Sequence, residues 1–165
     1  MKGKFILGMA LAAVSVLASA QTPAADSGQP VAAAVQQQFA KGEFAGFKFS
    51  IPAGAEITEN GGSYLLKYPD GSFGVSMTRT DARASDQRRA ESVVRGLARS
   101  MKLPAGSVKP VMINGLKGAM ATGEVEGSQV SVGVLVYGGK ELQLVVMNSP
   151  ARGEWARELL KTLTR

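Results

Sequence analysis

The chain has 165 residues, a formal net charge of +6 at pH 7, and neither cysteine nor histidine. Without these residue types it can form no disulfide and no Cys- or His-based nucleophilic site, and it lacks the usual ligands for zinc. We therefore expect no cofactor, no metal ion and no enzymatic activity. No basic–aromatic pattern of the kind that binds oligonucleotides is present, so we expect no nucleic-acid partner.

Residues 1–20 have the pattern of a cleavable secretory signal peptide. Lys2 and Lys4 precede an apolar run over residues 5–17, and Ala18-Ser19-Ala20 forms a small-x-small cleavage site. The run is shorter than the ~20 residues that a membrane-spanning helix needs. The sequence therefore predicts cleavage near Ala20-Gln21 and a mature protein in the periplasm, or secreted, that does not span a membrane. Loss of the two lysines lowers the net charge to +4.

Residues 21–43 are rich in Gln, Ala, Pro and Ser and poor in large apolar side chains. This composition is typical of a flexible linker, with a short helix over residues 31–41 as the alternative. We expect a single α+β domain over residues 44–165, which is an ordinary length for one hydrophobic core.

The first half of the expected domain has strand patterning. Phe47, Phe49 and Ile51 alternate with polar residues, which indicates a half-buried strand. A weak strand is expected over residues 56–59. Two more, over residues 64–68 and 73–79, flank the turn Pro69-Asp70-Gly71-Ser72.

The period then changes to that of an α-helix over residues 85–101. Ser85 or Asp86 is suited to cap its start, and Pro104 ends the helical pattern. The spacing places one apolar stripe on this helix, formed by Ala90, Val93, Val94, Leu97 and Met101.

A second group of strands follows. Strands over residues 108–113 and 116–125 flank Asn114-Gly115, a strong hairpin signal. A strand over residues 129–137 is followed by the turn Gly138-Gly139 and by a strand over residues 142–146. The last strand is apolar on both faces, so we expect it to be central and covered on both sides. Residues 151–164 predict a closing helix with Trp155 on its buried side.

The resulting order, ββββ-α-ββββ-α, predicts a mostly antiparallel sheet with two packing helices. This order resembles the PsbP-like α/β/α sandwich superfamily, in particular its bacterial envelope branch of DcrB-type proteins. The resemblance rests on residues 47–54, where a strand enters a Pro-x-Gly turn, on the central helix, on residues 113–119, and on the helix with Trp155. It implies a compact, usually non-enzymatic binding or assembly module. The chain differs from DcrB-type lipoproteins in having no cysteine to lipidate, and from cytoplasmic effector chaperones in its expected signal peptide.

Two carboxylates are the one candidate for acid–base chemistry. Glu124 and Glu126 are expected on one face of a strand, with side chains about 7 Å apart. A pair at this separation suits glycoside hydrolysis or a cation, but a polar strand end before Gly127-Ser128 is the favoured interpretation.

A basic ridge is the main candidate for binding. On an ideal helix the side chains of four cations fall within about 60° of one another, opposite the apolar stripe. They are Arg88, Arg95, Arg99 and Lys102, with Arg83 and Arg89 extending the charge near the helix start. Arginine suits bidentate recognition of carboxylate and phosphate. An ordinary solvated helix face is the alternative interpretation.

Together these features predict a secreted or periplasmic, non-catalytic binding or adaptor protein. It would act through a surface patch on a protein partner or an anionic envelope component. Three alternatives remain open: a small-molecule or lipid carrier, a carboxylate-only hydrolase of cell-wall glycan, and an immunity protein against a secreted effector. The sequence does not predict the oligomeric state.

Overall fold

The computed structural model describes residues 39–81 and 86–165. The expected signal peptide, residues 21–38 of the expected linker, Arg83 and Ser85 lie outside these ranges. In chain order the elements are β1 (Phe39–Phe44), β2 (Phe47–Pro52), β3 (Glu56–Asn60), β4 (Ser63–Lys67), β5 (Phe73–Thr80), α2 (Gln87–Ser100), the short helix η1 (Ala105–Ser107), β6 (Lys109–Ile113), β7 (Leu116–Val125), β8 (Ser128–Tyr137), β9 (Lys140–Asn148), the short helix η2 (Pro150–Arg152) and α3 (Gly153–Thr162).

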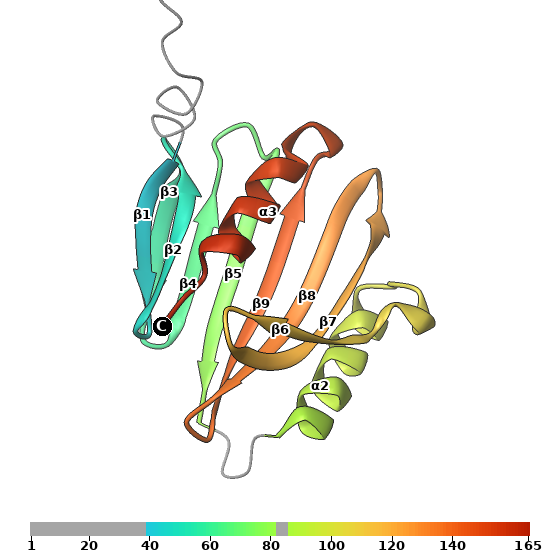
Figure 1. Cartoon of the computed structure of the whole chain (residues 1–165). Coiled ribbons are helices and arrows are strands. Elements are labelled where there is room, and N and C mark those ends of the chain that lie inside the picture. Colours follow the sequence, from blue (N-terminus) through green and yellow to red (C-terminus); the bar gives the residue numbers. More distant parts are fainter. Residues whose placement is uncertain (1–38, 82–85) are drawn as a thin grey trace, which may run out of the picture.

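Seven strands form one antiparallel sheet in the order β3-β4-β5-β9-β8-β7-β6. The expected antiparallel α+β architecture is confirmed, and the order of strands and helices agrees with the prediction except for the additional strand β1 (Figure 1). The two β blocks meet where β5 pairs with β9, for example Val75 opposite Val146. The C-terminal strand β9 is therefore central, as its apolar composition predicts.

Tight turns join neighbouring strands where the sequence signals are strongest. Asn114 and Gly115 both have positive φ angles, of 46° and 83°, between β6 and β7. Gly138 and Gly139 have φ angles of 51° and 76° between β8 and β9. Positive φ at both central residues is the geometry of a type I′ turn, whose twist matches that of the flanking strands.

The first described strand, β1, begins at Phe39, five residues before the domain boundary expected from composition. Strand β1 pairs with β2 in a separate two-stranded ribbon, and Gly42 lies opposite Phe49. The Phe49 ring occupies the space above Gly42, where an added Cβ would approach it to 2.5 Å. Strand β1 has a weak sequence signal because Gly, Lys and Glu have low strand propensity. Its extended conformation is stabilised instead by the cross-strand pairs that it forms with β2.

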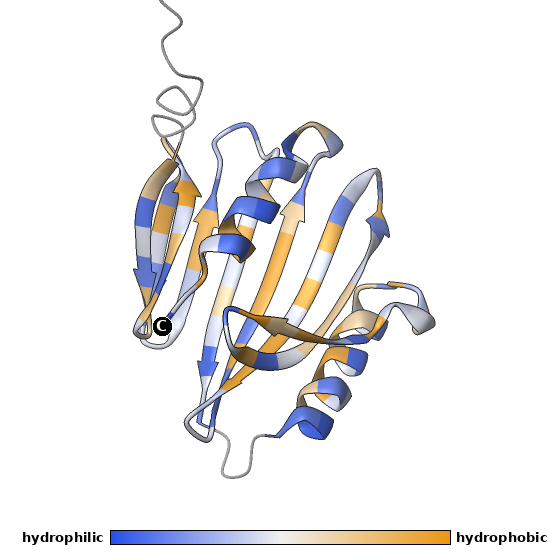
Figure 2. Cartoon of the chain, viewed as in Figure 1, coloured by the Kyte–Doolittle hydropathy of each residue, from blue (hydrophilic) through white to orange (hydrophobic). Residues whose placement is uncertain are grey.

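The sheet buries two different faces under two helices. Adjacent residues of β8 show this, since Leu135 belongs to the core beneath α3 and the β1–β2 ribbon, and Val134 to the core beneath α2. Figure 1 shows α3 crossing one face of the sheet near β5 and β9. Hydrophobic residues follow β8 and β9, and the outward sides of both helices are hydrophilic (Figure 2).

Coverage of the two faces is unequal. Helix α2 packs on β7 and β8, where Val132 and Val134 are fully buried. On the same face, beyond the reach of α2, Leu65 is 52% exposed and Met147 is 43% exposed. The expectation that the central strand is covered on both sides therefore holds only in part, because one 14-residue helix cannot span a seven-stranded sheet.

Among the described residues, none of the helices has the length and hydrophobicity needed to cross a membrane.

Candidate functional site

Helix α2 carries the basic ridge, and two contacts fix its beginning. Asp86 has extended backbone angles, and its carboxylate accepts a hydrogen bond of 2.8 Å from the Arg89 backbone N–H. This is an N-cap, which satisfies one of the free N–H groups of the first turn. The Gln87 side-chain amide donates to the carbonyl oxygen of Gly118 on β7. The cap predicted at Asp86 is confirmed, and the helix start is attached to the sheet.

The end of α2 alters the expected position of Lys102. The Leu103 N–H donates to the Ala98 carbonyl at 2.8 Å and the Lys102 N–H donates to the Arg99 carbonyl at 3.1 Å. This pair of bonds is a Schellman motif, with Lys102 at the position usually held by glycine. Its φ angle is +58°. The helix therefore ends at Ser100, and Lys102 lies in the turn that follows rather than on the helical ridge.

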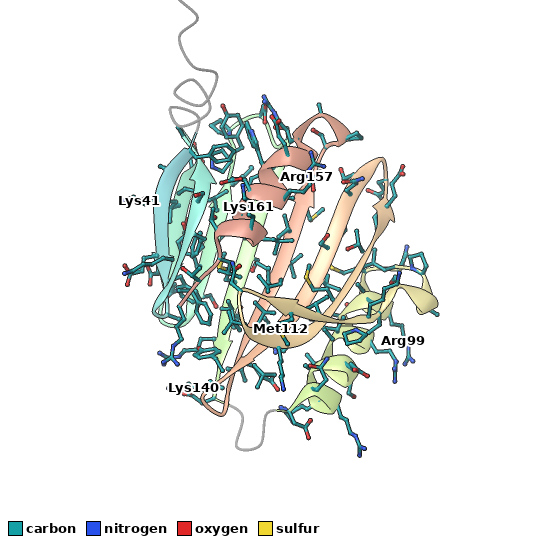
Figure 3. The ribbon with its side chains drawn as sticks, viewed as in Figure 1. Lys41, Arg99, Met112, Lys140, Arg157 and Lys161 are labelled. Carbon is teal, nitrogen blue, oxygen red and sulfur yellow. The ribbon has the colours of Figure 1, made fainter. Side chains whose placement is uncertain are left out.

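The remaining ridge residues have the expected placement. Arg88, Arg95 and Arg99 are all exposed on α2, and Lys102 is exposed after it. Among residues 39–81 and 86–165, none of these four cations forms an ion pair with a carboxylate. The nearest acid in the helix, Glu91, instead accepts a hydrogen bond of 3.5 Å from the Gln87 side chain. Figure 3 shows the Arg99 side chain extending away from the sheet into solvent.

Arg89 has a structural role that the sequence did not indicate. Its Nε lies 2.7 Å from Oε1 of Glu141, a carboxylate that is completely buried. The Arg89 side chain itself is half exposed. From the sequence, Arg89 was expected to extend the ridge, because helical spacing does not reveal that Glu141 on β9 is its partner. The available signal was a glutamate, Glu141, directly before the apolar residues of β9.

A small pocket opens at the C-terminal end of the ridge. It has a volume of about 140 Å³ and lies between α2 and the segment that connects α2 to β6. Its lining residues are Arg95, Ala98, Arg99, Leu103, Ala105 and Val108. Two guanidinium groups without an ion-pair partner among the described residues therefore flank a hollow whose other walls are apolar. Helical spacing does not reveal this pocket, because its walls meet only after the chain turns at Lys102.

The expected carboxylate pair is not formed as predicted. Strand β7 ends at Val125, and Glu126 has a φ angle of +51° in the turn before β8. Glu126 and Gly127 thus form a type I′ turn, and Glu126 does not share a strand face with Glu124. Within the described part of the chain, no three acidic residues cluster closely enough to hold a metal ion.

The aromatic side chains belong mainly to the core. The Phe47 and Tyr137 rings meet edge to face at 4.6 Å, and Tyr64 is 2% exposed. Burial, followed by the charge of Glu59, raises the pKa of Tyr64 above its ordinary value. Trp155 is 6% exposed and anchors α3, as its position on the closing helix predicts.

Two larger hollows are open to solvent. One, of about 480 Å³, lies beside the β1–β2 ribbon and Thr162 of α3. The other, of about 500 Å³, lies among η1, β6 and β7. Neither is an apolar cavity enclosed between the sheet and a helix, which is the feature that a carrier of apolar molecules would require.

Comparisons with known proteins add evidence on the fold. No family model matches the chain, and no curated protein matches it. The solution structure of the cyanobacterial PsbP protein, CyanoP, from Synechocystis sp. PCC 6803 matches with a TM-score of 0.51 and 11% sequence identity. The match covers 86% of this chain and 95% of that one. The fold is PsbP-like.

A crystal structure from Bacteroides thetaiotaomicron also matches, with a TM-score of 0.48 and 18% identity over 72% of this chain. The chain spans 44% of the length of that protein. At 11% identity the match to CyanoP bears on the fold alone. The PsbP-like fold agrees with the architecture of one antiparallel sheet and two helices described above.

Proposed function

We propose that this protein is a non-catalytic binding or adaptor protein of the bacterial envelope, and that it binds through the basic ridge. The observation that supports this proposal is the set of exposed cations on and after α2, which have no ion-pair partner among the described residues. The partner is an acidic protein surface or an anionic envelope component.

The physical argument is electrostatic. Arg88, Arg95 and Arg99 share one face of a single helix, so their fields add in the solvent beside it. Such a patch raises the rate of association with an anionic surface and orients the two partners as they meet. Guanidinium groups also bind carboxylates with two parallel hydrogen bonds, which makes the interaction directional.

Location in the envelope is part of the proposal. It is supported by the signal-peptide pattern of residues 1–20. Membership of the DcrB-type envelope branch is the finer assignment, and it is supported by the sequence resemblance together with the PsbP-like fold. N-terminal sequencing of the protein from a periplasmic fraction should give Gln21 as the first residue. An intact Met1 in that fraction would contradict export by cleavage.

Photo-crosslinking in the native envelope tests the binding surface. Ser92 is exposed on α2 close to the ridge, so a photoreactive amino acid at this position leaves all four cations in place. We expect a specific crosslinked species, identified by mass spectrometry, in the wild-type background. The double substitution Arg95→Glu and Arg99→Glu should abolish it.

The chain offers a matched control for this double substitution. Arg157 and Lys161 are exposed, are also four residues apart, and lie on α3 (Figure 3). Arg157→Glu with Lys161→Glu changes the net charge by the same amount, and we expect the crosslink to remain. Equal loss in both variants would assign the effect to net charge, and an unchanged crosslink in the ridge variant would remove the ridge as the binding surface.

A further inference from the structure

We infer that the pocket at the end of the ridge receives one apolar side chain from an acidic protein segment, whose carboxylates pair with Arg95 and Arg99. This inference rests on the proposed function and specifies the chemistry of the partner. It combines two features of the same surface, a small apolar hollow and the two guanidinium groups beside it, which have no ion-pair partner in the part of the chain that the structure describes.

The size of the pocket limits what it can hold. Its volume is about 140 Å³. A cavity of about 150 Å³ accommodates a benzene molecule, whereas sites for drug-sized ligands have volumes of about 300 Å³ or more. The pocket therefore fits a single side chain of the size of leucine or phenylalanine and is too small for a whole cofactor or lipid.

The residues that line the pocket determine which chemical groups it can bind. Ala98 and Leu103 are 3% and 6% exposed and form an apolar floor, with Ala105 and Val108 at the side. Arg95 and Arg99 come from successive turns of α2 and stand at the rim. An apolar group in the hollow would displace water from the floor, and a carboxylate on either side of it would meet a guanidinium.

An acidic peptide is favoured over a membrane surface. Interfacial binding usually combines basic residues with large apolar side chains that enter the lipid. The large hydrophobic side chains that the described residues expose are Ile57, Leu65, Met112 and Met147, and none of them lies on α2 or in the segment up to Val108. A concave, single-residue pocket is also suited to a protruding side chain and poorly suited to a flat bilayer.

The test uses two short labelled peptides and the whole protein. Both peptides carry two glutamates on each side of a central residue, which is leucine in one and serine in the other. Binding is measured by fluorescence anisotropy at low salt. We expect the leucine peptide to bind at least tenfold more tightly, which corresponds to about 1.4 kcal/mol. Arg95→Gln with Arg99→Gln should weaken both peptides.

A pocket-filling substitution provides the second measurement. Ala105 is exposed, follows Pro104 in η1 and lines the pocket, so Ala105→Trp should fill it without changing any charge. We expect this variant to lose the preference for leucine and to keep the weaker binding of the serine peptide. Ala151→Trp is the matched control, because Ala151 is an exposed alanine that follows Pro150 in η2. It should bind both peptides as the wild type does.

Equal affinity for the two peptides, or an unchanged leucine preference in Ala105→Trp, would overturn the inference. So would binding to vesicles of phosphatidylglycerol and phosphatidylethanolamine without binding of either peptide, which would assign the ridge to lipid. If the envelope crosslink depends on Arg95 and Arg99 but the leucine preference is absent, the proposed function stands and the pocket assignment fails. If the crosslink is independent of both arginines, the proposed function fails as well.

Discussion

The Arg89 guanidinium and the Glu141 carboxylate join α2 to the central strand β9, with 2.7 Å between Nε and Oε1. The two residues are 52 positions apart in the sequence. Glu141 is completely buried, and the half-exposed Arg89 side chain reaches it from α2. The pair therefore connects the solvent-exposed helix to the interior of the sheet.

Removing the arginine should destabilise the protein. We expect Arg89→Met to lower the free energy of unfolding by about 1–3 kcal/mol, because it deprives a buried carboxylate of a charged donor. Arg88→Met is the control, since Arg88 is exposed and has no ion-pair partner among the described residues; it should change stability by about 0.5 kcal/mol or less. Urea denaturation at neutral pH measures both. Equal effects would show that the ion pair adds nothing.

Two glycine-to-alanine substitutions should change the free energy of unfolding in opposite directions. A Cβ at Gly118 would overlap the carbonyl oxygen of Val134, a backbone atom of the neighbouring strand. We expect Gly118→Ala to destabilise the fold by about 1–3 kcal/mol or more. Gly96 is exposed within α2 and has open space around it, so Gly96→Ala should stabilise by about 0.5–1 kcal/mol. Thermal denaturation of the two variants measures this, and a shift of both midpoints in the same direction would contradict the prediction.

The left-handed backbone conformation at Lys102 predicts that glycine at this position increases the stability of the protein. Because φ is +58° there, Lys102→Gly should stabilise the protein by about 0.5–1 kcal/mol. Lys102→Ala removes the same charge but retains a Cβ, so it should bring no such gain. The difference between their thermal midpoints isolates the backbone contribution. Equal midpoints would contradict it.

The buried tyrosines predict the response to alkaline pH. Burial raises the pKa of both Tyr64 and Tyr137 above the ordinary value of about 10. A raised pKa in the folded state means that the stabilisation is complete below pH 10 and is lost as the pH rises through the folded-state value. We expect the free energy of unfolding to fall above pH 10, and to fall less steeply in Tyr64→Phe. The same slope in both proteins would exclude a contribution from Tyr64.

At neutral pH the same substitution should be harmless. The Tyr64 hydroxyl is buried and has no hydrogen-bond partner among the described residues. Tyr64→Phe removes this unsatisfied group and keeps the ring contacts with Phe44 and Phe49. We expect stability equal to or above that of the wild type, measured by urea denaturation at pH 7. A marked loss would indicate that the hydroxyl does have a partner.

Much of the fold could be predicted because its signals are local. The alternation at Phe47, Phe49 and Ile51, the turn at Asn114-Gly115 and the cap at Asp86 each depend on a few neighbouring residues. Strand β1 was missed because its residues have low strand propensity and acquire their order from the pairing with β2. The ridge at Arg88, Arg95 and Arg99 could likewise be found from helical spacing alone.

The candidate site was predictable only in part. Helical spacing placed Lys102 on the ridge, but the chain leaves the helix before it, and Glu126 turns out of its strand by the same kind of backbone change. The pocket between Arg95 and Val108 depends on that turn as well. The positive φ angles at Lys102 and Glu126 therefore decided which side chains lie close together.

The amino-acid sequence by itself determined the periodic helices and strands, the tight turns, and the exclusion of disulfides and of Cys- or His-based sites. Each of these follows from residue type and near-neighbour spacing. The tertiary structure decided that β5 pairs with β9, that α2 packs mainly on β7 and β8, and that Arg89 reaches Glu141. It also brought Arg95 and Arg99 to the rim of an apolar pocket. These outcomes join residues far apart in the chain, and they depend on which surfaces pack together, which local patterns do not encode.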